Sequence, residues 1–213
     1  MENKMKNTKL LIFGLVALVA AHSISAAEIG VSGMFAQGGF DHNDYQQASD
    51  EYDYSTGRIA LLVDNPIKPY LNYRVSLGLE GNSVSSPGGG SDTLFGLGMT
   101  HTFAFNVFKR PTFRIWMGPQ LRAVVYKGDG DRILDVSDNK GVSFGIGPEV
   151  GFSYRYNQRL NLGASLALVS GDLTFDEASN TSITSNSNYR GGDVEGSTYG
   201  GHFSLTATYN FGS

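Results

Sequence analysis

The chain has 213 residues, of which 40% are hydrophobic and 17% charged, with 28 glycines and no cysteine. Low charge and plentiful aromatic residues argue against a disordered chain, and the lack of cysteine excludes a disulfide scaffold and a cysteine-ligated zinc site. The formal net charge of -4, from 16 Lys and Arg against 20 Asp and Glu, is not the basic excess of a nucleic-acid-binding protein.

The first residues have the three parts of an export signal. A positively charged stretch, an apolar run and a site of small residues follow one another at Lys4–Lys9, Leu10–Ala21 and Ser25–Ala27. The apolar run is shorter than the roughly 20 residues that a membrane-spanning helix needs. We therefore predict a signal peptide over residues 1–27, cleaved after Ala27, and one mature domain over residues 28–213.

The mature chain alternates between apolar and polar residues with a period of two. From Leu71 to Leu79, for example, every second residue is large and apolar. Such alternation is typical of strands with one apolar and one polar face. We predict eight strands, each long enough to cross a bilayer at a tilt, at about 28–38, 54–64, 69–81, 93–106, 112–127, 141–156, 160–170 and 198–211.

The connectors alternate in length as well. Three are short, at 64–68, 107–111 and 157–159, and four are long and polar, at 39–53, 82–92, 128–140 and 171–197. Outer-membrane barrels have an even number of strands, short periplasmic turns and longer outer loops. The short turns carry the cations Lys68, Lys109, Arg110 and Arg159, whereas the long loops are acidic, with Asp41, Asp44, Asp50, Glu51 and Asp53 in the first.

Side-chain size indicates which strand face lies inside the barrel. The polar face is rich in Gly, Ser and Ala, which suit the narrow interior of eight strands. The opposite face is large and aromatic, as a lipid-facing surface is. A soluble lipocalin-like barrel, with an apolar interior, is the alternative. We predict an all-β fold, an eight-stranded antiparallel transmembrane β-barrel. Pro119 and Pro148 fall in mid-strand, where we expect a bulge or a bent hydrogen-bond pattern.

The predicted interior contains a set of charged side chains. By strand parity the inward-facing charges are Arg58, Arg74, Glu80, Arg114, Arg122, Glu149 and Arg155. Charges in a narrow interior must be paired or hydrated. Arg122 and Glu149 lie on consecutive predicted strands, at similar numbers of residues from the short turns. We therefore predict that they pair. We interpret the set as an ion-paired plug, and the alternative is a gate or an anion-tolerant pore.

The architecture and three motifs resemble a known group of proteins. Two strand motifs are Gly118-Pro119-Gln120-Leu121 and Gly147-Pro148-Glu149-Val150, and the last strand ends in Tyr209-Asn210-Phe211. With these, the mature chain resembles the small outer-membrane β-barrels of Gram-negative bacteria, namely outer-membrane proteins X and W, the opacity adhesins and the barrel of outer-membrane protein A. The resemblance implies an outer-membrane location, a monomer, and recognition of Tyr209 and Phe211 by the barrel-assembly machinery.

Other candidate sites are weaker. Asp129, Asp131, Asp135 and Asp138 offer hard oxygen ligands without the spacing of an EF-hand, and we expect at most loose divalent bridging to lipopolysaccharide phosphates. The spacing His202-x-Ser204 resembles that of outer-membrane lipid A deacylases, but Leu205 stands where those enzymes have Asn.

We therefore expect no enzyme and no cofactor. The favoured function is a structural or surface-interaction scaffold that meets outer-membrane lipid and lipopolysaccharide through acidic outer loops. The alternative is a narrow porin-like channel for small or hydrophobic solutes. A remote alternative is a lipid-modifying hydrolase that uses His202 and Ser204.

Overall fold

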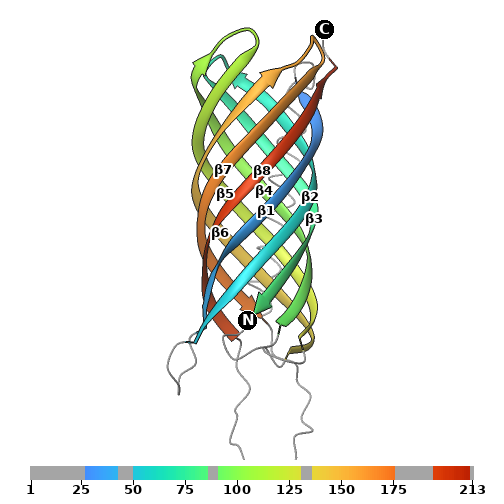
Figure 1. The fold of residues 1–213 in the computed structure, drawn as a ribbon, viewed down its shortest axis with the longest axis vertical. Coiled ribbons are helices and arrows are strands. Elements are labelled where there is room, and N and C mark those ends of the chain that lie inside the picture. Colours follow the sequence, from blue (N-terminus) through green and yellow to red (C-terminus); the bar gives the residue numbers. More distant parts are fainter. Residues whose placement is uncertain (1–26, 43–49, 86–90, 131–135, 176–193, 212–213) are drawn as a thin grey trace, which may run out of the picture.

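The computed structural model describes residues 27–42, 50–85, 91–130, 136–175 and 194–211, which form eight antiparallel strands (Figure 1). The strands are β1 (Glu28–His42), β2 (Asp50–Lys68), β3 (Leu71–Ser85), β4 (Ser91–Lys109), β5 (Phe113–Gly130), β6 (Val136–Arg155), β7 (Leu160–Phe175) and β8 (Val194–Asn210). Each strand pairs with its sequence neighbours, and β1 pairs with β8, so the barrel is closed. No helix within the described ranges is long and apolar enough to span a membrane. The predicted signal peptide lies outside the described residues, apart from Ala27.

The three short connections lie at one end of the barrel, together with the start of β1 and the end of β8 (upper end of Figure 1). The turn between β6 and β7 is closed by the side chain of Asn157, whose Oδ1 accepts hydrogen bonds from the backbone N–H groups of Arg159 and Leu160, at 2.9 and 2.8 Å. This is the side-chain-to-backbone bonding that makes Asn favourable in turns. We call this end the periplasmic end.

The exterior of the barrel is apolar over most of its height. Ile59, Leu79 and Leu168 are 76%, 73% and 69% exposed, although they are large hydrophobic side chains. They alternate along their strands with inward side chains that are buried and mostly small or polar. This arrangement excludes the lipocalin-like alternative and confirms the prediction of a transmembrane barrel. We call the outward-facing apolar residues of 29–35, 59–67, 71–79, 95–107, 113–125, 142–156, 160–168 and 199–211 the apolar band.

The strands run further at the opposite end than the alternation predicts. Within the predicted loop 39–53, β1 continues to His42 and β2 begins at Asp50. Within the predicted loop 82–92, β3 continues to Ser85. These additional segments form what we call the outer extension: residues 37–42, 50–55, 81–85, 91–93, 127–130, 136–141, 170–175 and 194–198. Its described outward side chains are polar, as at Asp53 and Thr93, so the apolar-outside pattern ends before the hydrogen-bonded ladder does.

The two mid-strand prolines face each other across β5 and β6. Pro119 is the direct partner of Pro148, and the β5–β6 register is unchanged around them. The β4–β5 ladder lacks two pairs beside Pro119, and the β6–β7 ladder lacks two beside Pro148, but the register is the same on both sides of each gap. A bulge is therefore wrong at these positions, and the alternative expectation, a locally altered hydrogen-bond pattern, describes both ladders. Each ladder omits the bonds that a proline cannot make and then resumes.

Candidate functional site in the barrel interior

The interior is filled from one side. The large inward side chains come mainly from β2 to β5, whereas β6, β7, β8 and β1 supply mostly Gly, Ala and Ser. Trp116 is 1% exposed and packs where Gly151 has no side chain, because a Cβ there would overlap the indole ring. Gly200 leaves room for the Tyr54 hydroxyl in the same way. The small-residue face predicted from the sequence is thus the space into which large side chains of β5 and β2 pack.

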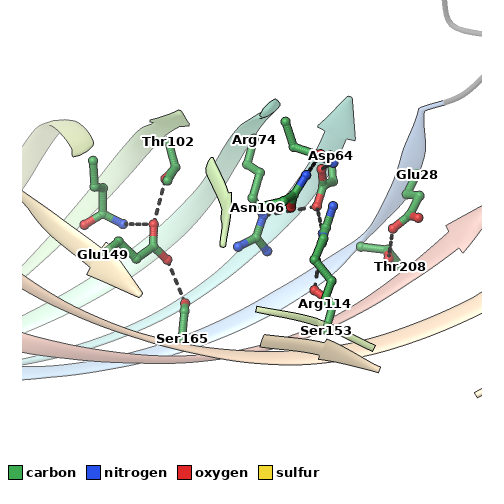
Figure 2. A network of polar contacts seen from close by, with 12 residues as sticks. Glu28, Asp64, Arg74, Thr102, Asn106, Arg114, Glu149, Ser153, Ser165 and Thr208 are labelled. Atoms are coloured by element: carbon green, nitrogen blue, oxygen red, sulfur yellow. Dashed lines mark hydrogen bonds and ion pairs between the residues drawn. The ribbon is translucent and has the colours of Figure 1, made fainter. Parts of the chain in front are cut away.

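The layer nearest the periplasmic end is centred on Asp64. Its carboxylate accepts hydrogen bonds from Arg114 Nη2 at 2.6 Å and from Asn72 Nδ2 at 2.6 Å, and Arg74 Nε lies 3.3 Å away (Figure 2). The Arg74 guanidinium also stacks on the Trp116 ring, 4.2 Å from its centroid. One buried carboxylate therefore holds two arginines in place across the lumen, as a buried charge requires.

The middle layer is centred on Glu149, which is 6% exposed. Its oxygens accept hydrogen bonds from the hydroxyls of Thr102 and Ser165, each at 2.7 Å, and from Gln120 Nε2 at 3.2 Å (Figure 2). All three donors are neutral and come from three different strands, β4, β7 and β5. Glu149 therefore links the four consecutive strands β4 to β7 through hydrogen bonds to uncharged groups.

A third layer, further toward the outer end, is centred on Glu80. Arg122 Nη2 donates to both carboxylate oxygens of Glu80, at 2.6 Å for Oε2, and the Tyr126 hydroxyl donates to Oε1. Arg58 is the direct cross-strand neighbour of Glu80, but its Nη1 donates to the Thr100 hydroxyl at 2.6 Å. The Glu80 layer fixes a salt bridge and a tyrosine hydroxyl in the lumen, between the middle layer and the outer end.

A small polar cavity remains beside these layers. It measures about 40 Å³, and its wall includes Arg58, Arg74, Glu149, Thr100 and Ser204. A cavity measured in this way needs roughly 10–15 Å³ for each water molecule, so about three waters fit. The cavity can hydrate the buried charges but is far smaller than a solute channel.

The outermost layer of the interior is apolar. Six buried side chains contact one another there: Tyr54, Val84, Leu94, Val124, Tyr126 and Leu173. Leu94, Val84 and Val124 are each 1% exposed. Tyr126 belongs to both layers, because its ring packs in this cluster while its hydroxyl reaches Glu80. We call these six residues the apolar cluster.

The structure changes two details of the predicted charge set. Arg122 pairs with Glu80 and not with Glu149, because the register places Arg122 opposite Gly145, four residues from Glu149. Arg155 is exposed at the periplasmic end and does not lie in the lumen.

The other predicted charges, Arg58, Arg74, Glu80, Arg114 and Glu149, do face the interior. Sequence reasoning missed Asp64 and Tyr126, although parity with Arg58 and Arg122 would have placed both inside. The alternation places Asp64 where the predicted strand 54–64 meets a short turn, whereas β2 continues to Lys68.

The possible hydrolase pair lacks the arrangement that catalysis needs. His202 is 3% exposed and points inward, but neither ring nitrogen has a hydrogen-bond partner among the described residues. Ser204 lines the small cavity on the same strand face. A nucleophile needs both a base in contact and a group that orients the base, and the described part of the chain supplies neither contact.

The acidic loop residues considered as cation ligands cannot be compared with the structure. Asp131 and Asp135 lie outside the described residues, as do the side chains of Asp129 and Asp138. Within the described ranges, no group of three or more His, Cys, Asp or Glu side chains is arranged to hold a metal ion.

Comparison with known proteins shows which solved structures have a similar fold. No family model matches the chain, and no curated protein matches it. Among solved structures, the crystal structure of the outer membrane protein OprG from Pseudomonas aeruginosa has a TM-score of 0.56 at 14% identity, over 89% of this chain and 98% of that chain. The solid-state NMR structure of the outer membrane protein AlkL in lipid bilayers has a TM-score of 0.50 at 14% identity, over 87% and 89%.

These similarities and the surface of the barrel lead to one conclusion. At this level of identity the two structures establish the fold. The apolar exterior and the polar interior establish that the barrel crosses a bilayer. The chain is therefore an eight-stranded barrel of the outer membrane.

Proposed function

We propose that this barrel is a closed scaffold that presents its outer segments at the cell surface and does not conduct ions. The observation that carries the proposal is the filled lumen. The buried Glu80 layer and the apolar cluster follow one another along the interior, and both draw side chains from several strands. Eight strands leave an interior just wide enough for side chains to fill, which also favours a closed barrel.

The proposed scaffold holds sequence segments that are rich in charge. The segment 39–53 contains Asp41, Asp44, Asp50, Glu51 and Asp53. Exposed connections on a rigid frame are where binding usually resides. We propose that these acidic segments contact lipopolysaccharide phosphates through divalent cations, since carboxylates and phosphates are both oxygen ligands for Ca²⁺ and Mg²⁺.

The direct test is single-channel conductance of the refolded protein in a planar bilayer. A mobility shift of the unheated barrel on a gel confirms folding in the same preparation. We expect an inserted wild-type barrel to give no discrete openings. Reproducible openings of the wild type would contradict the closed scaffold.

A separate test addresses the loops. Binding of vesicles that contain lipopolysaccharide is measured with and without Ca²⁺, for the wild type and for a variant with Asp41, Asp44, Asp50, Glu51 and Asp53 changed to Asn or Gln. We expect Ca²⁺-dependent binding that the variant loses while its barrel stays folded. Equal binding by both proteins would remove the acidic segments from the proposal.

A second candidate function is a passage for small apolar solutes. The apolar cluster favours it, because its buried side chains form an apolar layer inside the outer part of the lumen. Uptake of an apolar fluorescent dye into vesicles would test it. If Tyr54→Ala and Leu94→Ala each accelerate uptake without opening an ion current, the passage is supported. Unchanged uptake in both variants excludes it.

A further inference from the structure

Exposed cations lie at all three turns of the periplasmic end of the barrel. Five basic side chains lie exposed at the short turns or directly beside them: Lys68, Lys109, Arg110, Arg155 and Arg159. They belong to all three turns, so they are spread over the side of the barrel that runs from β2 to β7. We call these five residues the basic rim.

Several of these cations rest on aromatic side chains. Lys68 Nζ lies 5.8 Å from the centroid of the Tyr70 ring, and the Arg110 guanidinium lies 5.6 Å from that of Phe108. Arg159 Nη1 donates to the Tyr209 hydroxyl at 3.0 Å. Aromatic rings at the edge of an apolar surface, with cations extended beyond them, are typical of a membrane–water interface.

The acidic side chains described at this end leave the basic rim unneutralised. Asp64 is 2% exposed and binds Arg74 and Arg114 inside the lumen. Glu28 is directed to the Thr208 hydroxyl, 2.9 Å away. Within the described residues, the exposed surface of this end is therefore positive, whereas acidic residues dominate the sequence of the outer connections.

We propose that the basic rim binds the phosphate groups of anionic phospholipids in the inner leaflet of the membrane. Three observations favour lipid headgroups over a protein partner. The cations are divided among three separate turns, and they lie at the boundary of the apolar band. The charged groups of Lys68 and Arg110 also lie over aromatic rings. This inference is independent of the proposed scaffold function, because it concerns the opposite end of the molecule.

The test measures which lipids surround the refolded full-length barrel. Spin-labelled phosphatidylglycerol and spin-labelled phosphatidylcholine are compared in vesicles of phosphatidylcholine. We expect phosphatidylglycerol to be enriched about two- to fivefold at the barrel surface, which is the size of effect that one Lys or Arg near a membrane produces. Salt at roughly 0.5 M should reduce the enrichment, because it shortens the range of exposed charges.

Matched variants locate the effect. Changing the five basic-rim residues to Gln should bring the enrichment to about one, since no rim cation remains to attract a phosphate. Lys127→Gln, which removes an exposed cation at the outer end of β5, should keep the preference of the wild type. Lys68→Arg with Lys109→Arg should keep it as well, because charge is retained.

Two outcomes would overturn the proposal. One is an enrichment in the five-Gln variant equal to that of the wild type, with both barrels folded by gel mobility. The other is a wild type without lipid preference that sediments with peptidoglycan and loses this binding in the five-Gln variant. That second result would assign the basic rim to the cell wall. If the five-Gln variant does not fold, single changes at Lys68 and Arg110 are measured in the same way, and unchanged enrichment in both would also overturn it.

Discussion

The apolar band and the outer extension have opposite polarity, although the same strands build both. On β2, Arg58 is buried in the lumen beside Ile59, which is 76% exposed on the outside. Four residues away on the same strand, Tyr54 is buried in the apolar cluster beside the exposed Asp53. On β2, the inside of the barrel is charged where its outside is apolar, and apolar where its outside is charged.

The solvent outside the barrel explains this inversion. Lipid surrounds the apolar band, so burying apolar side chains in the lumen gains little there, and the interior can hold ion pairs. Water surrounds the outer extension, so its stability depends on an apolar interior, as in a soluble protein. The hydrogen-bonded ladder is common to both regions, and the side chains follow the local solvent. Four predictions separate the two regions, from the largest expected effect to the smallest.

The largest effect is expected at Glu80. The change Glu80→Ala leaves Arg122 buried without its carboxylate and removes the acceptor of the Tyr126 hydroxyl. Breaking a buried pair in this way costs about 3–5 kcal/mol of the free energy of unfolding. Urea unfolding in vesicles, followed by fluorescence of the lone tryptophan, Trp116, measures the loss.

Glu149→Gln is the matched control for Glu80→Ala. Glu149 receives its described hydrogen bonds from neutral donors, so the isosteric amide should cost only about 1–2 kcal/mol. If both substitutions cost the same, the charge on Glu80 is not what holds its layer together.

The second effect concerns the apolar cluster. Leu94 is 1% exposed inside the barrel, so Leu94→Ala should leave a cavity and cost about 3 kcal/mol. Leu97 is 52% exposed to lipid on the same strand, where acyl chains fill the space that Leu97→Ala creates. We expect that control to cost about 1–2 kcal/mol, the transfer energy alone. Equal losses in urea unfolding would show that the cluster is not packed as a core.

The third prediction finds the edge of the membrane. Leu97→Arg places a cation in the apolar band and should cost about 2–3 kcal/mol. Thr93 lies four residues further on the same outward face, in the outer extension. Thr93→Arg should cost about 0–1 kcal/mol, because the side chain meets water or headgroups. A cost at Thr93 as large as at Leu97 would place the outer extension inside the bilayer.

The opposite polarity of the two regions also explains which strand bounds could be predicted from the sequence. The period of two predicted all eight strands. It also predicted which side chains face outward and which face inward at the level of the apolar band, because lipid imposes a strong pattern there. The same pattern ended the predicted strands too early, since β2 begins at Asp50 and not at residue 54. In the outer extension apolar residues point inward, and a pattern that looks for apolar residues outside does not recognise them.

The ion pairs in the lumen could not be predicted by counting how many residues separate each charged side chain from its short turn. Arg122 on β5 reaches Glu80 on β3, and β4 lies between these two strands. The side chains meet because β4 has glycine at this level: a Cβ on Gly98 would lie 3.0 Å from Glu80 Oε2. The residue counts therefore predicted a pair between neighbouring strands, Arg122 with Glu149. The missing side chain of Gly98 on β4 instead allows Arg122 to reach Glu80 on the far side of β4.

The smallest expected effect tests whether these glycines are kept for packing. A Cβ on Gly96 would lie 2.8 Å from Tyr126 Cδ1 and 2.9 Å from Val124 Cγ1, so Gly96→Ala must displace part of the apolar cluster. We expect a loss of about 1–2 kcal/mol in urea unfolding. Gly57 faces outward on β2 with no atom within 4 Å of its Cβ position. Gly57→Ala should be neutral or stabilise the barrel by about 0.5 kcal/mol, because glycine is unfavourable within a strand. If both substitutions proved neutral, the interior would have room that a closed lumen lacks, and the passage for apolar solutes would become the better explanation of the apolar cluster.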